Sequence, residues 1–332
     1  MKLHFLNYLS VAVLAIFLVG CSDDEGNPPS SEPTPSLAAQ LSAESEFSIL
    51  VEALEKTSLD AALDAEGTFT VFAPNNAAFE ALFVDLGVSD LDGAIDLLGA
   101  AEIKTILEYH VLDTTLNQSA LSSGYLTTTA TNSQGHNLSA YLAKGNQVKL
   151  NDIATVITAN IEGSNGVAHE LDAVLMPANL YELMLVDPMY SSLETLAKLS
   201  GGNIDLLLGN ETEVYTLFAP SNAAFDTLIA NTPNVANLAD LAADLGQQQL
   251  TTLIKYHLSG SDLRAESLSI GSYNSLASNT SGGFYQFNVN INNGIYSISD
   301  LSSLSPNAKI ELTNITAVNG TMHGISNVLL FQ

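Results

Sequence analysis

Hydrophobic residues recur at two different spacings along this chain, first with a helical period and then in alternation with polar residues. Phe47, Leu50 and Leu54 fall on one helical face, and residues 93–109 keep the same period, so both segments are predicted helices. Short alternating runs broken by Gly and Asn follow and predict strands. In the first half these runs are 125–130, 137–142, 147–150, 154–161 and 169–175. Helices followed by strands indicate the α+β class.

The second half of the chain repeats this order. Its late predicted strands are 284–291, 294–299, 308–317 and 325–331. Three pairs of segments match in the same order: TVFAPNNAAF at 70–79 with TLFAPSNAAF at 216–225, LEYHV at 107–111 with IKYHL at 254–258, and NGVAHELDAVLMP at 165–177 with NGTMHGISNVLL at 319–330. Ordered matches at a nearly fixed separation indicate tandem duplication. The separation grows toward the end, and we place the insertion in the second copy within residues 278–294.

The repeated ten-residue segment predicts a strand followed by a helix. Residues 68–72 are β-branched and alternating, which predicts a strand, and Pro74 ends it because proline has no amide to donate to a ladder. Asn75 or Asn76 is then a suitable N-cap for a helix over residues 77–83. The segment is therefore interpreted as a signature of the fold and not of a catalytic site.

These motifs together resemble the fasciclin domain: the TVFAP strand, the Tyr-His pair at a helix end, and the closing strand after Asn-Gly. The resemblance covers a first copy over residues 37–178 and a second over residues 179–332. It implies that each copy is a β-sandwich or wedge flanked by small helices. The second copy departs from the pattern, because it lacks the proline that the first has at Pro177.

The resemblance also implies a class of function. Fasciclin domains are commonly extracellular adhesion modules that bind matrix proteins, polysaccharides or other copies of themselves. Carried over to this chain, the candidate partner contacts are Tyr109 and His110 in the first copy, and Tyr256 and His257 in the second. No cofactor is implied.

The shared histidines allow a chemical and a structural interpretation. A tyrosine beside a histidine could act as general acid and base. His110 and His257 also suit a helix C-terminus, where the dipole favours them and backbone groups can satisfy the ring. His169 and His323 follow an Asn-Gly turn and are predicted to hold it by a hydrogen bond. The structural interpretation is favoured in both cases.

Known catalytic and metal-binding motifs are missing from the sequence. There is no G-x-S-x-G, H-E-x-x-H, P-loop or EF-hand spacing. We therefore expect no catalytic residue, no metal site and no enzyme activity. A polysaccharide-processing enzyme or accessory protein with an unidentified acidic pair stays open as an alternative, as does calcium on an acidic face.

A second surface is suggested by four aromatic residues of the second copy, Tyr273, Phe284, Tyr285 and Phe287. Such rings stack well on sugars, but in strands they are more often part of a half-buried core. The sequence leaves both interpretations open.

The N-terminus resembles that of a bacterial lipoprotein. Residues 1–20 have a positive start and a short apolar run, as in a secretory signal, and they end in Leu18-Val19-Gly20 before Cys21. Cys21 is the only cysteine, which fits lipidation and excludes a disulfide. We expect this residue to carry lipid and to attach the protein to a membrane.

Residues 21–36 have the composition of a tether rich in Pro, Ser and acidic residues. Asp23, Asp24 and Glu25 resemble the acidic export tag of surface lipoproteins, so we expect an outer-membrane protein exposed on the cell surface. A periplasm-facing structural or stress-response protein is the alternative.

The net charge of the chain excludes one class of binding partner. The chain has 36 acidic and 9 basic residues and a net charge of −27. Phosphate binding needs clustered Lys and Arg, so nucleic acid is excluded as a partner.

Overall fold

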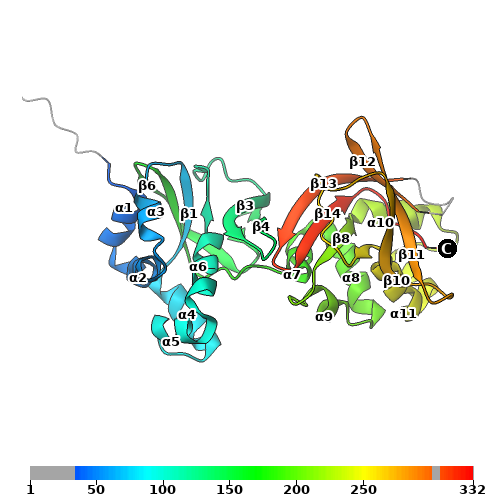
Figure 1. Cartoon of the computed structure of the whole chain (residues 1–332), viewed down its shortest axis with the longest axis horizontal. Helices are drawn as coiled ribbons and strands as arrows, with labels where there is room; N and C mark the ends of the chain where they lie inside the picture. The colour runs from blue at the N-terminus through cyan, green and yellow to red at the C-terminus, as the bar shows by residue number, and fades with distance from the viewer. Residues whose placement is uncertain (1–33, 301–306, 332) are drawn as a thin grey trace, which may run out of the picture. The chain divides into compact units, whose positions relative to one another are not determined.

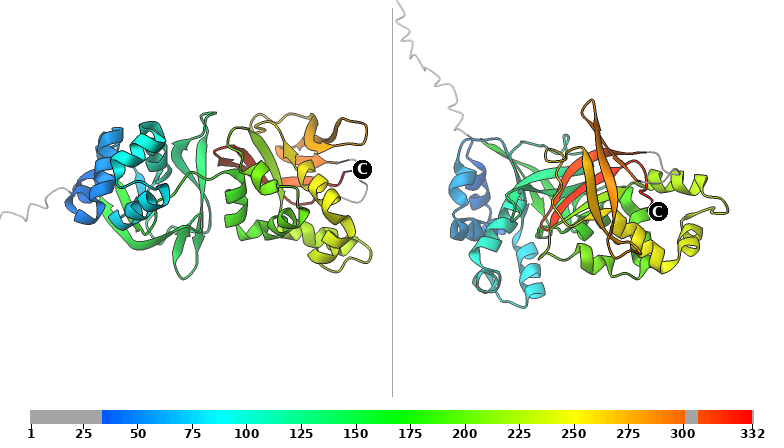
Figure 2. Two further views of the ribbon diagram at one scale, coloured as in Figure 1. Left: turned by 90° about the horizontal axis from the view of Figure 1, so that it is seen from below. Right: turned by 45° about the vertical axis from the view of Figure 1, so that its right-hand side comes forward.

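Two copies of one α+β unit make up the part of the chain that the structure describes. This computed structural model describes residues 34–300 and 307–331 (Figure 1). The predicted signal, Cys21 and most of the predicted tether fall within residues 1–33 and lie outside the described residues. In each copy, helices precede most of the strands and gather beside the sheet (Figures 1 and 2).

The first copy folds as seven short helical segments around one sheet. The helices are α1 (Leu37–Ala43), η1 (Ser45–Phe47), α2 (Ser48–Thr57), α3 (Asp60–Asp64), α4 (Asn76–Leu86), α5 (Leu91–Leu98) and α6 (Ala100–Tyr109). The strands are β1 (Phe69–Pro74), β2 (Val111–Leu112), β3 (Gly124–Thr131), β4 (Asn137–Lys144), β5 (Val148–Leu150), β6 (Ala154–Gly163) and β7 (Gly166–Leu171). Their order in the sheet is β2-β1-β7-β6-β5-β4-β3.

The second copy repeats this arrangement. Its helices are α7 (Leu180–Val186), η2 (Pro188–Tyr190), α8 (Ser191–Ser200), α9 (Ile204–Leu208), α10 (Asn222–Asn231) and α11 (Leu238–Tyr256). Its strands are β8 (Tyr215–Pro220), β9 (Leu258–Ser259), β10 (Gly271–Ser278), β11 (Phe284–Asn292), β12 (Ile295–Ser299), β13 (Ala308–Ala317) and β14 (Gly320–Ile325), in the order β10-β11-β12-β13-β14-β8-β9. The predicted class is confirmed: α+β, with a seven-stranded wedge and flanking helices in each copy.

One parallel pair of strands organises each sheet. β1 pairs with β7 in parallel, and β8 pairs with β14 in the same way, whereas the other pairs are antiparallel. The edge strands of each sheet, β2 with β3 and β9 with β10, approach each other without a ladder between them. We call the line between two such edge strands the seam.

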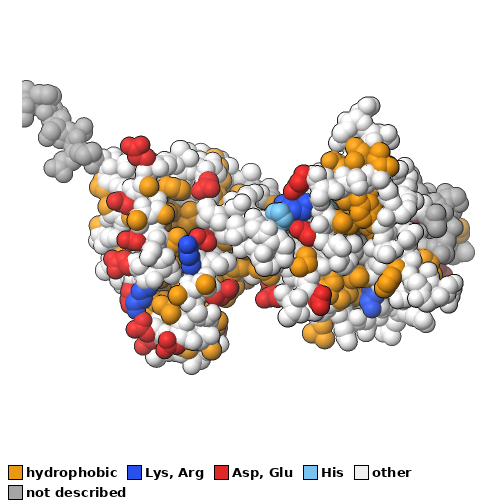
Figure 3. All heavy atoms as spheres, viewed as in Figure 1, with side chains coloured by type: hydrophobic (Ala, Val, Ile, Leu, Met, Phe, Trp, Pro, Cys, Tyr) orange, Lys and Arg blue, Asp and Glu red, His pale blue; other side chains and the backbone are white. Residues whose placement is uncertain are grey.

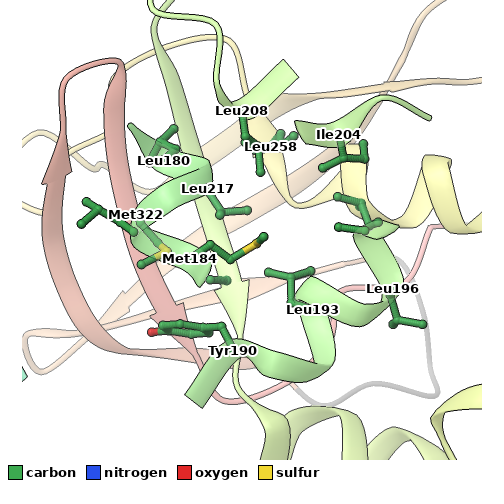
Figure 4. Close-up of a cluster of buried hydrophobic side chains, with 14 of the residues drawn as sticks. Leu180, Met184, Tyr190, Leu193, Leu196, Ile204, Leu208, Leu217, Leu258 and Met322 are labelled. Atoms are coloured by element: carbon green, nitrogen blue, oxygen red, sulfur yellow. The ribbon is translucent and has the colours of Figure 1, made fainter. Parts of the chain in front are cut away.

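Alternation along the parallel pair separates two hydrophobic cores in each copy. In the first copy Val71 and Ala73 face the helices, whereas Phe72 faces the inside of the curved sheet. In the second copy Leu217 faces the helices and Phe218 the inside. Figure 4 shows the helix-side core of the second copy, in which Met184 and Leu193 lie beside Leu217.

Two predicted elements have different bounds in the structure. The helix predicted over 93–109 is two helices, because Gly99 takes a φ of +91° between α5 and α6. The strands predicted over 169–175 and 325–331 begin earlier and end at Leu171 and Ile325. Each strand starts at its Asn-Gly turn. After the strand ends, the chain leaves the sheet, and its amides bond to other groups, as Leu175 N does to His110.

The insertion in the second copy lies later than the sequence suggested. Leu150 pairs with Ala154 in the first copy, and the equivalent Ile298 pairs with Ala308 in the second. Most of the extra residues therefore fall between β12 and β13, after residues 278–294. The repeat alone could not locate them, because the matched motifs lie far to either side.

The glycine of the Asn-Gly turn is fixed by close contact with the paired strand. Gly166 has a φ of +153°, and a Cβ there would lie 2.1 Å from the backbone oxygen of Phe69. Gly320 has a φ of +141°, with the corresponding distance to Tyr215 O at 1.9 Å. A side chain at either position would separate the parallel strands.

We expect Gly166→Ala to lower the free energy of unfolding by more than about 2 kcal/mol, because it adds a steric clash to an unfavourable φ. Gly124 is a matched control, since it has a φ of +144° and a Cβ added there would have nothing within 4 Å. Gly124→Ala should cost only about 1 kcal/mol. Urea unfolding of both variants measures the difference, and equal losses would contradict the proposed role of the contact.

Candidate functional site

Each polar residue of the repeated ten-residue segment is used inside its own copy. Thr70 Oγ1 donates to Thr114 O at 2.5 Å and accepts from Leu116 N at 2.8 Å. Thr216 makes the equivalent bonds to Ser261 O and Leu263 N at 2.6 and 2.7 Å. The segment therefore fixes the loop that follows the adjoining edge strand.

The two positions after the proline hold helices. Asn75 caps α4 by accepting from Ala78 N at 3.0 Å, which confirms the predicted N-cap, and Ser221 does the same for α10. Asn76 accepts from Ile49 N at 3.0 Å and donates to Ser45 O at 2.9 Å, so it joins α4 to the start of α2. Asn222 makes the equivalent pair of bonds in the second copy.

The Tyr-His pair lies in the interior of each copy. Tyr109 and His110 are 1% and 2% exposed, and Tyr256 and His257 are both 1% exposed. Tyr109 OH donates to Ser139 O, and Tyr256 OH donates to Gln286 O, each at 2.7 Å. The tyrosine thus ties the end of the helix to the strand beside it.

His110 and His257 each join a helix end to the last loop of their copy. His110 Nδ1 lies 2.7 Å from Ile106 O, and its Nε2 accepts from Leu175 N at 2.9 Å. His257 makes the same contacts to Leu253 O and Leu329 N. Because a carbonyl only accepts and an amide only donates, each ring is neutral with its proton on Nδ1. Burial lowers the pKa of both rings to about 4.

His169 and His323 are held by the opposite tautomer. His169 Nε2 donates to Leu116 O at 2.8 Å, and its Nδ1 accepts from Asn160 N at 3.3 Å. His323 makes the equivalent bonds to Leu263 O and Asn314 N. Burial lowers the pKa of both groups. The structural role is as predicted, but the rings hold a neighbouring loop and a strand bulge and not the Asn-Gly turn.

The asparagine of the Asn-Gly turn is a third shared polar link. Asn165 Oδ1 accepts from Leu37 N at 2.9 Å, and its Nδ2 donates to Leu63 O and Ala65 O. Asn319 repeats the set with Leu180 N, Leu208 O and Asn210 O. One buried amide in each copy therefore connects the last strand to the first helix.

The prediction that Tyr109, His110, Tyr256 and His257 contact a partner needs correction. Their side chains are covered on all sides, and their polar atoms already have partners within the copy. They shape the fold and do not present a surface to another molecule.

The described ranges contain neither a metal-binding cluster nor a membrane-spanning helix. Residues 34–300 and 307–331 contain no group of three or more His, Cys, Asp or Glu side chains placed to hold a metal ion. No helix in these ranges is long and apolar enough to cross a membrane. The predicted lipid site, Cys21, lies outside them.

Surface hollows that differ between the copies lie at the two seams. Beside the first seam, Val111 of β2 and Thr129 of β3 border an apolar cleft, which also includes Leu54 of α2, Leu63 of α3 and the acidic Asp113. At the second seam, the hollow is lined by serines, one asparagine and two aromatic rings, and no charged residue. Figure 3 shows hydrophobic side chains gathered over the strands of the second copy, with acidic ones dispersed over the first.

A family model settles what these two copies are. The model described as "Fasciclin domain" matches residues 45–177 and 188–331. The chain belongs to the fasciclin domain family. Both matched ranges contain the parallel strand pair and the buried histidines described above.

Relatives of this fasciclin protein span bacteria and animals. It is 39% identical to "Protein sll1483" of Synechocystis over 135 residues, which are 40% of this chain and 67% of that protein. It is 27% identical to the pig "Transforming growth factor-beta-induced protein ig-h3" over 274 residues, which are 81% of this chain and 35% of that protein. The chain thus spans about a third of the length of this animal relative.

A solved structure shows the same fold. The fasciclin domain pair of the insect cell adhesion molecule fasciclin I matches with a TM-score of 0.52 at 20% sequence identity, over 85% of this chain and 97% of that one. At 20% identity, this match shows a shared fold.

The aromatic cluster noted in the sequence divides between core and surface. Phe287 is fully buried, and Tyr285 is half-buried against Tyr256 and Phe331. Tyr273 and Phe284 line the hollow at the second seam. Strand alternation alone could not distinguish the buried rings from those at the hollow, because the hollow forms only where the two edge strands of the curved sheet approach each other.

The buried histidines should make these fasciclin domains lose stability in mild acid. Their folded-state pKa values lie below the ordinary 6.5, so the unfolded chain binds more protons between about pH 6.5 and 4, and stability falls as the pH drops through that range. From pH 7.5 to 5.5 we expect a loss of about 1 kcal/mol for each such histidine. Urea unfolding at both pH values measures it.

The double variant His110→Gln/His257→Gln should be less stable at pH 7.5 but show a smaller difference between the two pH values. His136→Gln is the control, because His136 is only partly buried. An unchanged pH dependence in the double variant would contradict the assignment.

Proposed function

We propose that this protein is a lipid-anchored surface protein that mediates adhesion through its two fasciclin domains. The observation that carries the proposal is the pair of fasciclin domains, which accounts for nearly all of the described residues. The solved domain pair of the same fold comes from a cell adhesion molecule. The partner is extracellular polysaccharide, matrix protein or another copy of this chain.

Two features of the domains favour binding of another molecule over catalysis. The polar groups shared by the two copies are buried and bonded, so they are occupied by the fold. The surface differs between the copies at the seams. Two different sites on one anchored chain would together bind more tightly than either alone, because the second contact forms at a high effective concentration, and this suits adhesion by weak contacts.

The sequence before residue 34 supports the anchor. Cys21 follows a lipobox-like segment, and the tether after it is rich in Pro and Ser. Residues 22–33 are long enough to hold the domains away from a bilayer, at up to about 3 Å per residue in extended form. Three acids after the cysteine fit export to the outer face of the outer membrane.

Cys21→Ser should release the protein from the membrane fraction, because the hydroxyl cannot form the thioether to lipid. Ser22→Ala is the matched control and should stay in the membrane fraction. Fractionation and immunoblotting measure both. Membrane association that survives Cys21→Ser would contradict lipid anchoring.

Intact cells should then lose the folded domains when a protease that cannot cross the outer membrane is added. The adhering property is measured as retention of these cells on immobilised matrix proteins and polysaccharides, with cells carrying Cys21→Ser as the comparison. Protection of the domains from the protease would contradict surface adhesion and favour a periplasmic role in the envelope.

A further inference from the structure

A groove runs along the seam of the second domain, between β9 with its following loop and strand β10. It has a volume of ≈ 390 Å³, which is within the range of small-molecule sites. Ser261 and Leu263 lie on the loop side, Tyr273 and Asn274 on β10, and Phe284 at the start of β11. The groove is therefore built from three separate segments of one domain.

No charge faces this groove, although the chain is strongly acidic. None of the ten residues that line it is charged. The neighbouring Asp262 accepts from Thr321 Oγ1 at 2.6 Å, and Arg264 Nε donates to Glu266 at 2.9 Å, so both charges are bonded elsewhere. A neutral ligand meets no desolvated charge here, whereas an ionic ligand finds no counter-charge.

One of the two aromatic rings of the groove, Tyr273, is held in place by the fold. The Tyr273 ring stacks on the buried Phe287 at 6.0 Å and 12°, and its hydroxyl both accepts from Ser269 N and donates to Ser269 O at 3.1 Å. Phe284 is 52% exposed, which is unusual for a ring of its size. Exposed aromatic rings suit the apolar C–H faces of sugar rings, and a ring that the fold already holds, as it holds Tyr273, loses little entropy when a sugar binds.

Hydrogen-bonding groups lie beside these rings. Asn274 is exposed, and its Oδ1 accepts from Gln286 Nε2 at 2.8 Å, which leaves Nδ2 without a protein partner among the residues that the structure describes. Ser261 is also exposed. β10 pairs with β11 on one side only, so its other edge adds backbone donors and acceptors. Amide, hydroxyl and backbone groups match the hydroxyls of a neutral saccharide.

The first domain lacks this combination at the same register. Gly124 and Gly271 occupy equivalent ladder positions, so Leu126 and Thr127 stand where the second domain has Tyr273 and Asn274. By the same register, Asn137 replaces Phe284, and Asp113 replaces Gly260. The first seam therefore has neither of these two rings and carries a carboxylate, so this uncharged aromatic lining is a feature of the second domain.

We propose that the seam groove of the second domain binds a neutral saccharide, which stacks on Tyr273 and Phe284 and bonds to Asn274. This rests on the proposed function and names the ligand class for one of its sites. The first domain does not contribute to this binding.

The test is native electrophoresis of the whole chain from Ser22 onward in gels that contain dextran, mannan, xylan or β-1,3-glucan, with acidic alginate as the charged comparison. We expect retardation by at least one of the four neutral polymers. Asn274→Ala/Phe284→Ala should weaken it at least tenfold, since both side chains are exposed and their loss leaves the core intact. Thr127→Ala/Asn137→Ala, the equivalent pair in the first domain, should leave it unchanged.

Thermal unfolding of both variants checks that they fold. No retardation by any neutral polymer, equal retardation of the Asn274→Ala/Phe284→Ala variant, or retardation by alginate alone would overturn the proposal. The proposed function is tested separately: cells that adhere while the purified chain binds no neutral polymer would retain adhesion and remove only the saccharide site.

Discussion

Each domain depends on the parallel pairing of its first and last strands. β1 and β7 are separated by most of the first copy along the chain, yet Phe72 lies opposite His169 in their register, with ring centroids 5.6 Å apart. Phe218 and His323 repeat this contact at 5.5 Å. Gly166 allows the two backbones to approach, and Asn165 ties the same strand to the first helix. Several of the residues that repeat between the copies cluster around this pair, and their contacts stabilise it.

Because the shared residues serve the strand pairing, functional differences between the copies must come from other residues. The shared Tyr, His, Asn and Thr side chains are occupied by bonds within the domain, so a ligand cannot use them without opening the fold. The differences between the copies lie at the seams, where edge strands approach without pairing. Recognition is therefore expected at positions that the duplication did not preserve, such as Tyr273 and Phe284.

The sequence predicted the fold more fully than the site. Ordered repeats and changes of hydrophobic period identified two α+β copies, and turn chemistry identified the Asn75 cap. The burial of Tyr109 and His110 could not be predicted, because a polar residue at a helix end is equally typical of a surface and of a satisfied core position. The groove was only partly visible as an aromatic cluster, since the loop that completes it is remote in sequence from Phe284.

The central claim is that the shared histidines are internal structural links and not contacts for a partner. Nitrogen NMR of the imidazoles in the whole chain tests it most directly. We predict neutral rings at pH 6, with the proton on Nδ1 in His110 and His257 and on Nε2 in His169 and His323, and no shift when a bound polysaccharide is added. Titration of these rings near pH 6.5, or a shift of their signals by the ligand, would contradict the account.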